Sequence, residues 1–120
     1  MPAIYGPEPV HGWCYYFERA GLAAQMKDWT AVTELGNAAF LLDDFPNDPV
    51  ERFVFIEGYA HKGNWERALE LSTASYRVSP DYVGPLLCPL WDRIRAQTDP
   101  APTREANLAK VKSMFACAPE

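Results

Sequence analysis

Two ionisable side chains in the middle of the chain have the spacing of an acid–base pair. Glu57 and His61 are four residues apart, so a helix would bring them onto one face. A carboxylate beside an imidazole can orient the ring for proton transfer. The same spacing is also typical of a surface pair that adds little to helix stability. A small-molecule or enzymatic site around Glu57 and His61 is therefore the third hypothesis for function, behind a binding role and a structural role.

No other group of residues completes a catalytic site. Enzymes need a nucleophile beside a base, paired carboxylates in a cleft, a metal set or a phosphate loop. The seven glycines are scattered singly, so the chain has no glycine-rich loop to hold a phosphate. The sequence predicts that the protein is not an enzyme and that it uses no cofactor.

Metal-binding residue types are present, but their spacing does not suit a metal site. The three cysteines, Cys14, Cys88 and Cys117, are widely spaced with no Cys-x-x-Cys pair, and adding His11 and His61 does not give the spacings of a zinc site. A structural zinc site needs four ligands at short spacings. Four acidic residues crowd one loop, at Asp43, Asp44, Asp48 and Glu51. They lack the alternating ligands and the glycine of a calcium-binding loop. We therefore predict no metal, and reduced cysteines that act as small apolar residues.

Composition and charge place the chain among globular proteins. It has 120 residues, 48% of them hydrophobic, and a net charge of −5. Its basic residues form no concentrated stripe, which excludes nucleic acid as the expected partner. No apolar run approaches the length of a membrane span, and residues 1–7 lack the basic region and the apolar block of a signal peptide. We expect a soluble cytoplasmic protein with no direct membrane insertion, unless the chain is a domain excised from a larger protein.

The middle of the chain repeats with an offset of 36 residues. The matching pairs include Trp29 with Trp65, Glu34 with Glu70, and Leu35 with Leu71. A repeat of this length indicates stacked helical hairpins. We therefore expect Trp29 and Trp65 to lie in matching core environments.

Caps and breakers predict where the helices begin and end. Residues 1–10 contain three prolines and are expected to form an extended lead-in to one helical domain over 11–120. Six helices are expected, over about 11–27, 29–44, 49–62, 65–78, a segment that ends at 97, and 103–116. Gly63 should end one helix in the left-handed conformation, and Pro85 and Pro89 should kink the fifth helix or delay its start. The predicted N-caps are Asp28, Asp48, Asn64 and Thr103.

The second copy of the repeat resembles the tetratricopeptide repeat. The residues that match the family's preferences are Tyr59, Gly63, Trp65, Ala68 and Pro80. The first copy matches at Ala20, but Lys27 replaces the turn glycine and Val32 replaces a small residue. The resemblance covers about residues 14–97, and it implies an all-α, short right-handed array of antiparallel hairpins. The repeats would span about 13–46 and 49–80, followed by a partial or capping pair over about 82–117.

The resemblance also implies a concave face lined by the first helix of each hairpin. We expect this face to carry Phe17, Gln25, Phe53, Glu57, His61, Leu87, Trp91 and Arg95. Aromatic anchors with a few charges are typical of the centre of a binding patch. The leading hypothesis is a non-catalytic module that binds a protein or peptide of unknown identity. The family's basic clamp for C-terminal carboxylates is absent, with Phe17, Gly21, Val54, Gly84 and Cys88 at those positions.

A second, weaker resemblance suggests a structural role. Segments 13–18, 55–60 and 87–91 look like a soluble C-terminal region of some bacterial multispanning membrane proteins, including glycosyltransferase-like ones. This implies an accessory domain that packs on its own parent protein. Two and a half repeats also leave an end for another chain to cover. A self-associating module, such as a homodimer, is therefore kept as an alternative.

Overall fold

The computed structural model describes residues 11–42, 46 and 48–117. Within them it contains six α-helices, a short 3-10 helix (Pro49–Arg52) that leads into the third, and no strand. The α-helices are α1 (Trp13–Gln25), α2 (Trp29–Ala39), α3 (Phe53–His61), α4 (Trp65–Val78), α5 (Pro80–Gln97) and α6 (Pro102–Phe115). This confirms the prediction of an all-α fold with six helices. The predicted lead-in over residues 1–10, together with Asp43 and Asp44, lies outside the described residues.

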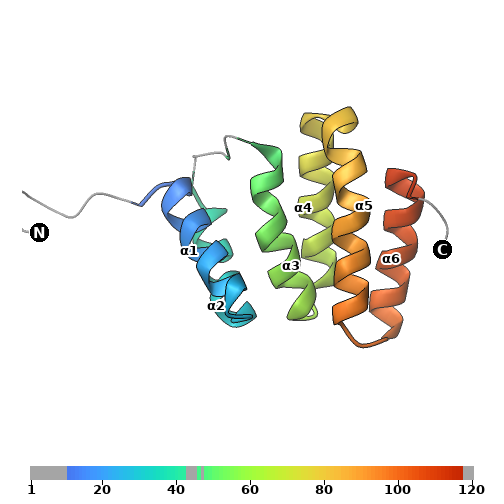
Figure 1. Cartoon of the computed structure of the whole chain (residues 1–120), viewed down its shortest axis with the longest axis horizontal. Coiled ribbons are helices and arrows are strands. Elements are labelled where there is room, and N and C mark those ends of the chain that lie inside the picture. Colours follow the sequence, from blue (N-terminus) through green and yellow to red (C-terminus); the bar gives the residue numbers. More distant parts are fainter. Residues whose placement is uncertain (1–10, 43–45, 47, 118–120) are drawn as a thin grey trace, which may run out of the picture.

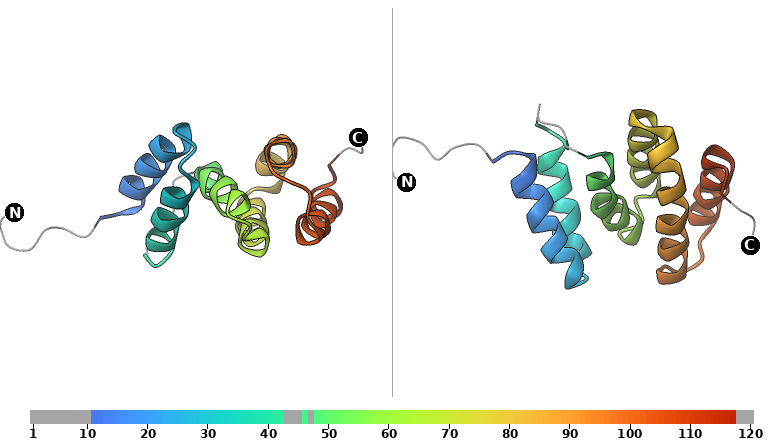
Figure 2. Two further views of the ribbon diagram at one scale, coloured as in Figure 1. Left: turned by 90° about the horizontal axis from the view of Figure 1, so that it is seen from below. Right: turned by 45° about the horizontal axis from the view of Figure 1, so that its top comes forward.

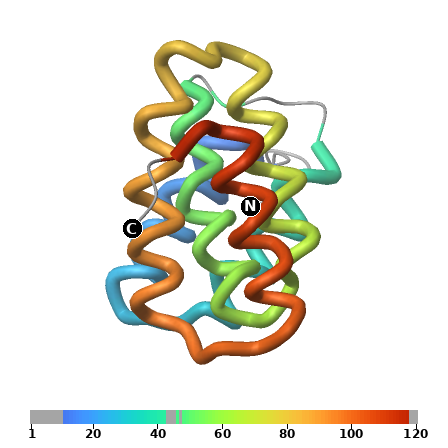
Figure 3. Tube along the Cα trace, turned by 90° about the vertical axis from the view of Figure 1, so that its right-hand side faces the viewer, coloured from blue at the N-terminus to red at the C-terminus, as the bar shows by residue number. Residues whose placement is uncertain are grey.

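The helices alternate between two layers along the chain. α1, α3 and α5 run in one direction, and α2, α4 and α6 run back between them, so neighbours in sequence are antiparallel (Figure 1). Figure 2 shows the odd-numbered helices along one side of the row and the even-numbered helices along the other. In Figure 3, which looks at the C-terminal end, α6 stands in front of α4 and α5. The α1–α2 hairpin and α6 therefore form the two ends of the row.

The turns inside the first two hairpins have the same backbone geometry. Lys27 (φ 57°) and Gly63 (φ 81°) both adopt the left-handed conformation, and they are 36 residues apart. The following amides, of Asp28 and Asn64, each donate to a carbonyl five residues earlier, at 2.9 and 2.8 Å. The predicted left-handed end at Gly63 is confirmed. Lys27 makes the same turn with a side chain that tolerates this conformation less well than glycine does.

Three of the four predicted N-caps are observed in the structure. The side-chain oxygens of Asp28, Asn64 and Asp48 accept hydrogen bonds from amides in the following turn, at 3.1, 3.2 and 3.0 Å. The prediction for Thr103 is wrong, because α6 begins one residue earlier, at Pro102. Proline suits the first position of a helix, where its missing N–H has no helical partner to lose.

The fifth helix ends at Gln97 as predicted, and of the two predicted alternatives, a kink or a late start, the late start is wrong. It begins directly at Pro80 and continues through Pro85 and Pro89 to Gln97. The carbonyls that would accept from residues 85 and 89 belong to Asp81 and Pro85, and both residues are exposed. Water can therefore replace the two missing donors, and the helix does not have to start late.

Two aromatic groups form the centre of the core. Near the N-terminal hairpin, the rings of Trp13, Phe40 and Phe55 meet edge to face, with centroids 5.3–5.4 Å apart. Further along the row, Trp65 and Trp91 pack with centroids 6.3 Å apart. Such contacts add to the free energy gained by burying the rings.

The expectation of matching environments for Trp29 and Trp65 is wrong. Trp65 is buried against Trp91, whereas Trp29 is half-buried and stacks on His61 with centroids 4.2 Å apart. The two rings meet different partners on the helix that follows each hairpin, because Trp29 contacts His61 near the end of α3 and Trp65 contacts the buried ring of Trp91 on α5.

The prediction of reduced cysteines is also wrong. Cys88 on α5 and Cys117, just after α6, form a disulfide with an S–S distance of 2.03 Å and Cα atoms 5.5 Å apart. Cys14 is exposed and has a free thiol. The bond was hidden in the sequence because its cysteines are 29 residues apart and meet only after α6 folds back on α5.

Candidate interaction face

One side of the row is formed by α1, α3 and α5. Because the hairpin repeats with an offset of 36 residues, residues that differ by 36 in number occupy equivalent positions on these helices. We define the first-helix face by the residues on this side: Phe17, Gln25, Phe53, Glu57, His61, Leu86, Arg93 and Gln97.

Two contacts across this face join residues that are 36 apart. The guanidinium of Arg93 on α5 donates to both carboxylate oxygens of Glu57 on α3, at 3.1 and 2.9 Å. One turn further along, His61 Nε2 lies 3.2 Å from Gln97 Oε1. Bidentate pairing fixes the relative position of two side chains more closely than a single contact does. The hydrogen bonds from Arg93 to Glu57 also raise the pKa of Arg93.

His61 is enclosed between an aromatic ring and an amide. Its imidazole stacks on Trp29, with an interplanar angle of 10°, and hydrogen bonds to Gln97. Burial lowers the pKa of His61, although its contact with Gln97 and the charge of Glu57 act in the opposite direction. The neutral ring donates from Nε2, because the amide oxygen of Gln97 can only accept.

Glu57 and His61 are not joined to each other by a hydrogen bond among the described contacts. The carboxylate of Glu57 is engaged by Arg93, and the imidazole of His61 by Gln97. The acid–base pair suggested by their spacing is therefore replaced by two separate links between α3 and α5. Each link positions one side chain and leaves neither group directed at the other.

The structure separates the predicted face residues into two sets. Phe17, Phe53, Glu57 and His61 are partly exposed and Gln25 is exposed, and all five lie on α1 or α3. Leu87 and Trp91 are buried in the core, at 0% and 2% exposure. Arg95 is exposed, but it lines a hollow between α5 and α6 instead. The three α5 residues therefore lie away from the first-helix face.

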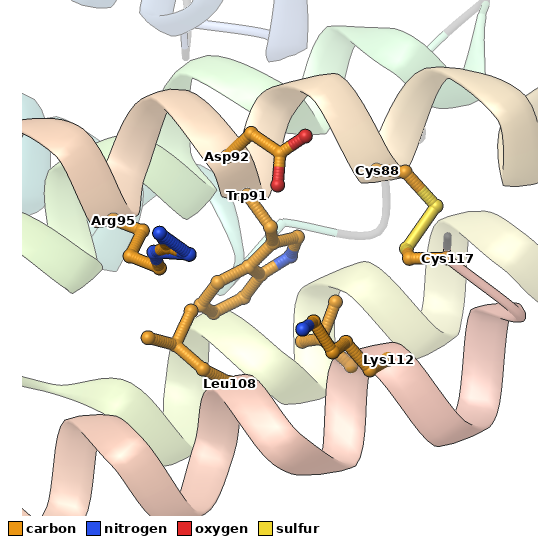
Figure 4. Close-up of a pocket in the computed structure, with 8 residues that line it drawn as sticks. Cys88, Trp91, Asp92, Arg95, Leu108, Lys112 and Cys117 are labelled. Carbon is orange, nitrogen blue, oxygen red and sulfur yellow. A yellow bond between two sulfur atoms is a disulfide. The ribbon is translucent and has the colours of Figure 1, made fainter. Parts of the chain in front are cut away.

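Figure 4 shows the hollow that Arg95 lines. The side chain lies near Trp91 and Leu108, and Lys112 and the Cys88–Cys117 disulfide lie on the other side of the Trp91 ring. The hollow has a volume of about 30 Å³. This is space for about one water molecule, so an organic ligand would not fit.

Sequence reasoning missed Arg93 and Gln97 as members of the face. Both follow from the repeat, since they lie 36 residues after Glu57 and His61. Leu86 was also missed, although it is 41% exposed on the same side of α5. The irregular, proline-rich start of α5 obscured its alignment with the earlier helices.

A polar hollow of about 290 Å³ lies where the turns of the second and third hairpins meet. Its lining residues are Ala60, His61, Gly63, Trp65, Gln97, Thr98 and Asp99. His61 and Gln97 are already hydrogen-bonded to each other on its wall. Across residues 11–42, 46 and 48–117, no group of three or more histidine, cysteine, aspartate or glutamate side chains could hold a metal ion.

No protein-family model, curated protein or solved structure matches the chain. None of the helices in the described part of the chain is long and apolar enough to cross a bilayer.

Proposed function

We propose that this chain is a non-catalytic interaction module that binds a protein or peptide segment on its first-helix face. The proposal includes the tetratricopeptide-like nature of the array. That resemblance is supported by the 36-residue spacing of the two left-handed turns and of the two α3–α5 contacts.

The observation that carries the proposal is the preorganised polar pair beside exposed apolar surface. Arg93 and Glu57 hold each other in place, and Leu86 projects from α5 on the same side, two turns before Arg93. Phe17 and Phe53 are partly exposed on the neighbouring helices. Binding to such a face loses less side-chain entropy than binding to freely rotating side chains.

The proposed occupant is a segment with bulky apolar side chains, such as an amphipathic helix. Leu86, Phe17 and Phe53 offer apolar contacts, as expected for the centre of a binding patch. Because Arg93 and Glu57 neutralise each other, the face carries no concentrated positive charge. A polyanion would therefore find little to bind, consistent with the exclusion of nucleic acid.

Selection from a random-peptide display library, followed by affinity measurement by fluorescence anisotropy, tests this proposal. Leu86→Asp should weaken the selected peptides by about tenfold or more, because it places a charge at an apolar contact. Lys110→Glu, at an exposed position on α6, is the matched control and should leave affinity unchanged. A library that yields no binder, or binders that respond to Lys110→Glu and not to Leu86→Asp, would contradict the proposal.

A charge exchange refines the same test. Glu57→Lys alone should break the pair with Arg93 and weaken binding, and Glu57→Lys with Arg93→Glu should rebuild the pair with reversed orientation. Recovery of affinity in the double variant would mean that binding depends on an intact ion pair between positions 57 and 93. A loss of affinity in the double variant would mean that binding depends on the sign of the charge at each position.

The sequence and the disulfide point to different compartments for the protein. The sequence predicts the cytoplasm, whereas disulfides are more typical of oxidising compartments. The cytoplasmic location therefore stays a prediction that the Cys88–Cys117 bond counts against. The membership of a larger bacterial membrane protein also stays a prediction.

A further inference from the structure

The outer side of the α1–α2 hairpin contains an open hollow of about 360 Å³. It is lined by Arg19, Ala23, Ala31, Glu34, Leu35 and Ala38, and we call this surface the end face. The opposite side of α2 packs on α3, where a Cβ added to Gly58 would meet Val32 and Thr33. The end face therefore points away from the rest of the row.

Large apolar side chains border the end face without being covered. Leu22 and Met26, three and seven residues after Arg19 on α1, are 62% and 82% exposed. Leu41, three residues after Ala38, is 86% exposed. Repeat arrays need a polar outer surface on their terminal units to remain soluble. The exposed Leu22, Met26 and Leu41 depart from this pattern and give the α1–α2 hairpin part of the character of an internal unit.

The end face also carries one positive and one negative side chain, at the same height along the axes of α1 and α2. Arg19 lies on the α1 wall of the hollow and Glu34 on the α2 wall, and no ion pair joins them. The guanidinium of Arg19 is held over the ring of Tyr15, 4.9 Å from its centroid. An isologous interface requires a patch that is complementary to itself, and opposite charges on opposite walls meet that requirement.

We propose that the end face binds a second copy of this chain and forms a two-fold dimer. A two-fold axis parallel to the helices places α1 of each copy over α2 of the other, at the same level and in the opposite direction. Arg19 of each copy then meets Glu34 of the other, so the interface contains two ion pairs. The alanines of the hollow allow the helices to approach closely, and Leu22 and Met26 become buried.

The dimer does not depend on the proposed peptide-binding role. The end face uses the outer side of α1 and α2, whereas the first-helix face runs across α1, α3 and α5. A dimer of this kind covers the open end of each row and leaves the first-helix face accessible in both copies.

Sedimentation equilibrium over a range of concentrations tests the proposal. The parent chain should reach twice its mass of 13.5 kDa. Arg19→Glu and Glu34→Arg should each weaken the dimer by about tenfold or more, because each places like charges opposite one another. The combination of Arg19→Glu with Glu34→Arg should restore the affinity, since it rebuilds both pairs. Lys110→Glu should have no effect.

Arg19 and Glu34 are both exposed, so the variants should remain folded, and their helix content and melting temperature would check this. A parent chain that stays monomeric at every concentration would overturn the proposal. A dimer that is indifferent to the single charge reversals, or is not restored by the double one, would overturn it as well.

Discussion

At the C-terminal end of the row, α6 is fixed by a disulfide from Cys88 to Cys117, whereas at the N-terminal end the outer hollow is bordered by exposed Leu22 and Met26. The hollow between α5 and α6 measures about 30 Å³, and the one between α1 and α2 about 360 Å³. The C-terminal hairpin also has Arg104, which is 5% exposed and donates to the carbonyl of Arg95.

This difference shows how a short helical array can close one end and leave the other open. A hairpin inside an array buries both of its faces against neighbours, but a terminal hairpin must satisfy one face by itself. The α5–α6 pair is held together by a covalent bond and by hydrogen bonds. The α1–α2 hairpin has no comparable device among its described residues, and we infer that a second molecule supplies the missing contact.

The largest expected effect contrasts one residue from each end. Trp91 is 2% exposed and donates to Ser72 Oγ at 2.9 Å, so Trp91→Ala should lower the free energy of unfolding by about 3–5 kcal/mol. Met26→Ala, measured where the chain is monomeric, should change it by less than about 0.5 kcal/mol. Urea unfolding of both variants provides the measurement. Equal losses would mean that the N-terminal end is packed as tightly as the C-terminal one.

The disulfide should provide the next largest effect. Replacing Cys88 and Cys117 by serine should lower the free energy of unfolding by about 2–4 kcal/mol, because the bond closes a loop of 29 residues. The comparison belongs in a Cys14→Ser background, which removes the free thiol. If the oxidised and reduced forms unfold at the same urea concentration, the disulfide does not stabilise the C-terminal end.

Two glycines test how the N-terminal hairpin is attached to the remainder. A Cβ at Gly58 would overlap Val32 on α2, so Gly58→Ala should destabilise the fold by about 1–3 kcal/mol. Gly21 on α1 has nothing within 4 Å of the same atom, and Gly21→Ala should be neutral or stabilising by up to about 1 kcal/mol. Thermal melts of the pair check the prediction. If Gly58→Ala melts with the parent, the α2–α3 contact is looser than the structure indicates.

The smallest expected effect is the pH dependence that comes from His61, between the two ends. Burial lowers its pKa below the ordinary 6.5, so the unfolded chain binds this proton more readily than the folded chain does. The neutral ring of His61 contributes to the free energy of unfolding above pH 6.5. This contribution is lost as the pH falls from 6.5 towards the lower pKa that His61 has in the folded chain. His61→Gln should flatten the stability profile in that window. A parent and a variant with parallel profiles would contradict this prediction.

Local features of the fold could be predicted from the sequence, because they depend on neighbouring residues. Asn64 and Gly63 determine the second hairpin turn, and the predicted range 65–78 for the fourth helix agrees with α4. The repeat could also have predicted the contact between Arg93 and Glu57, since these residues are separated by the same offset of 36.

Features that depend on how α5 and α6 meet could not be predicted in the same way. Leu87 and Trp91 have the residue types of a binding face, but the rotation of α5 directs them into the core. The helix continues through Pro85 and Pro89, and these two prolines obscured its alignment with α3 in the sequence. The Cys88–Cys117 bond likewise requires α6 to fold back on α5, and no local pattern encodes that contact.

The difference between the two ends can be measured directly with methyl-labelled methionine. Met26 borders the end face and Met114 lies on α6 at the other end, 82% and 46% exposed. Methyl NMR spectra recorded across a dilution series, with Met26→Leu and Met114→Leu for assignment, would follow both ends in one sample. The dimer predicts that the Met26 signal shifts with concentration while the Met114 signal stays fixed. A fixed Met26 signal, or a shift at Met114 alone, would contradict the account.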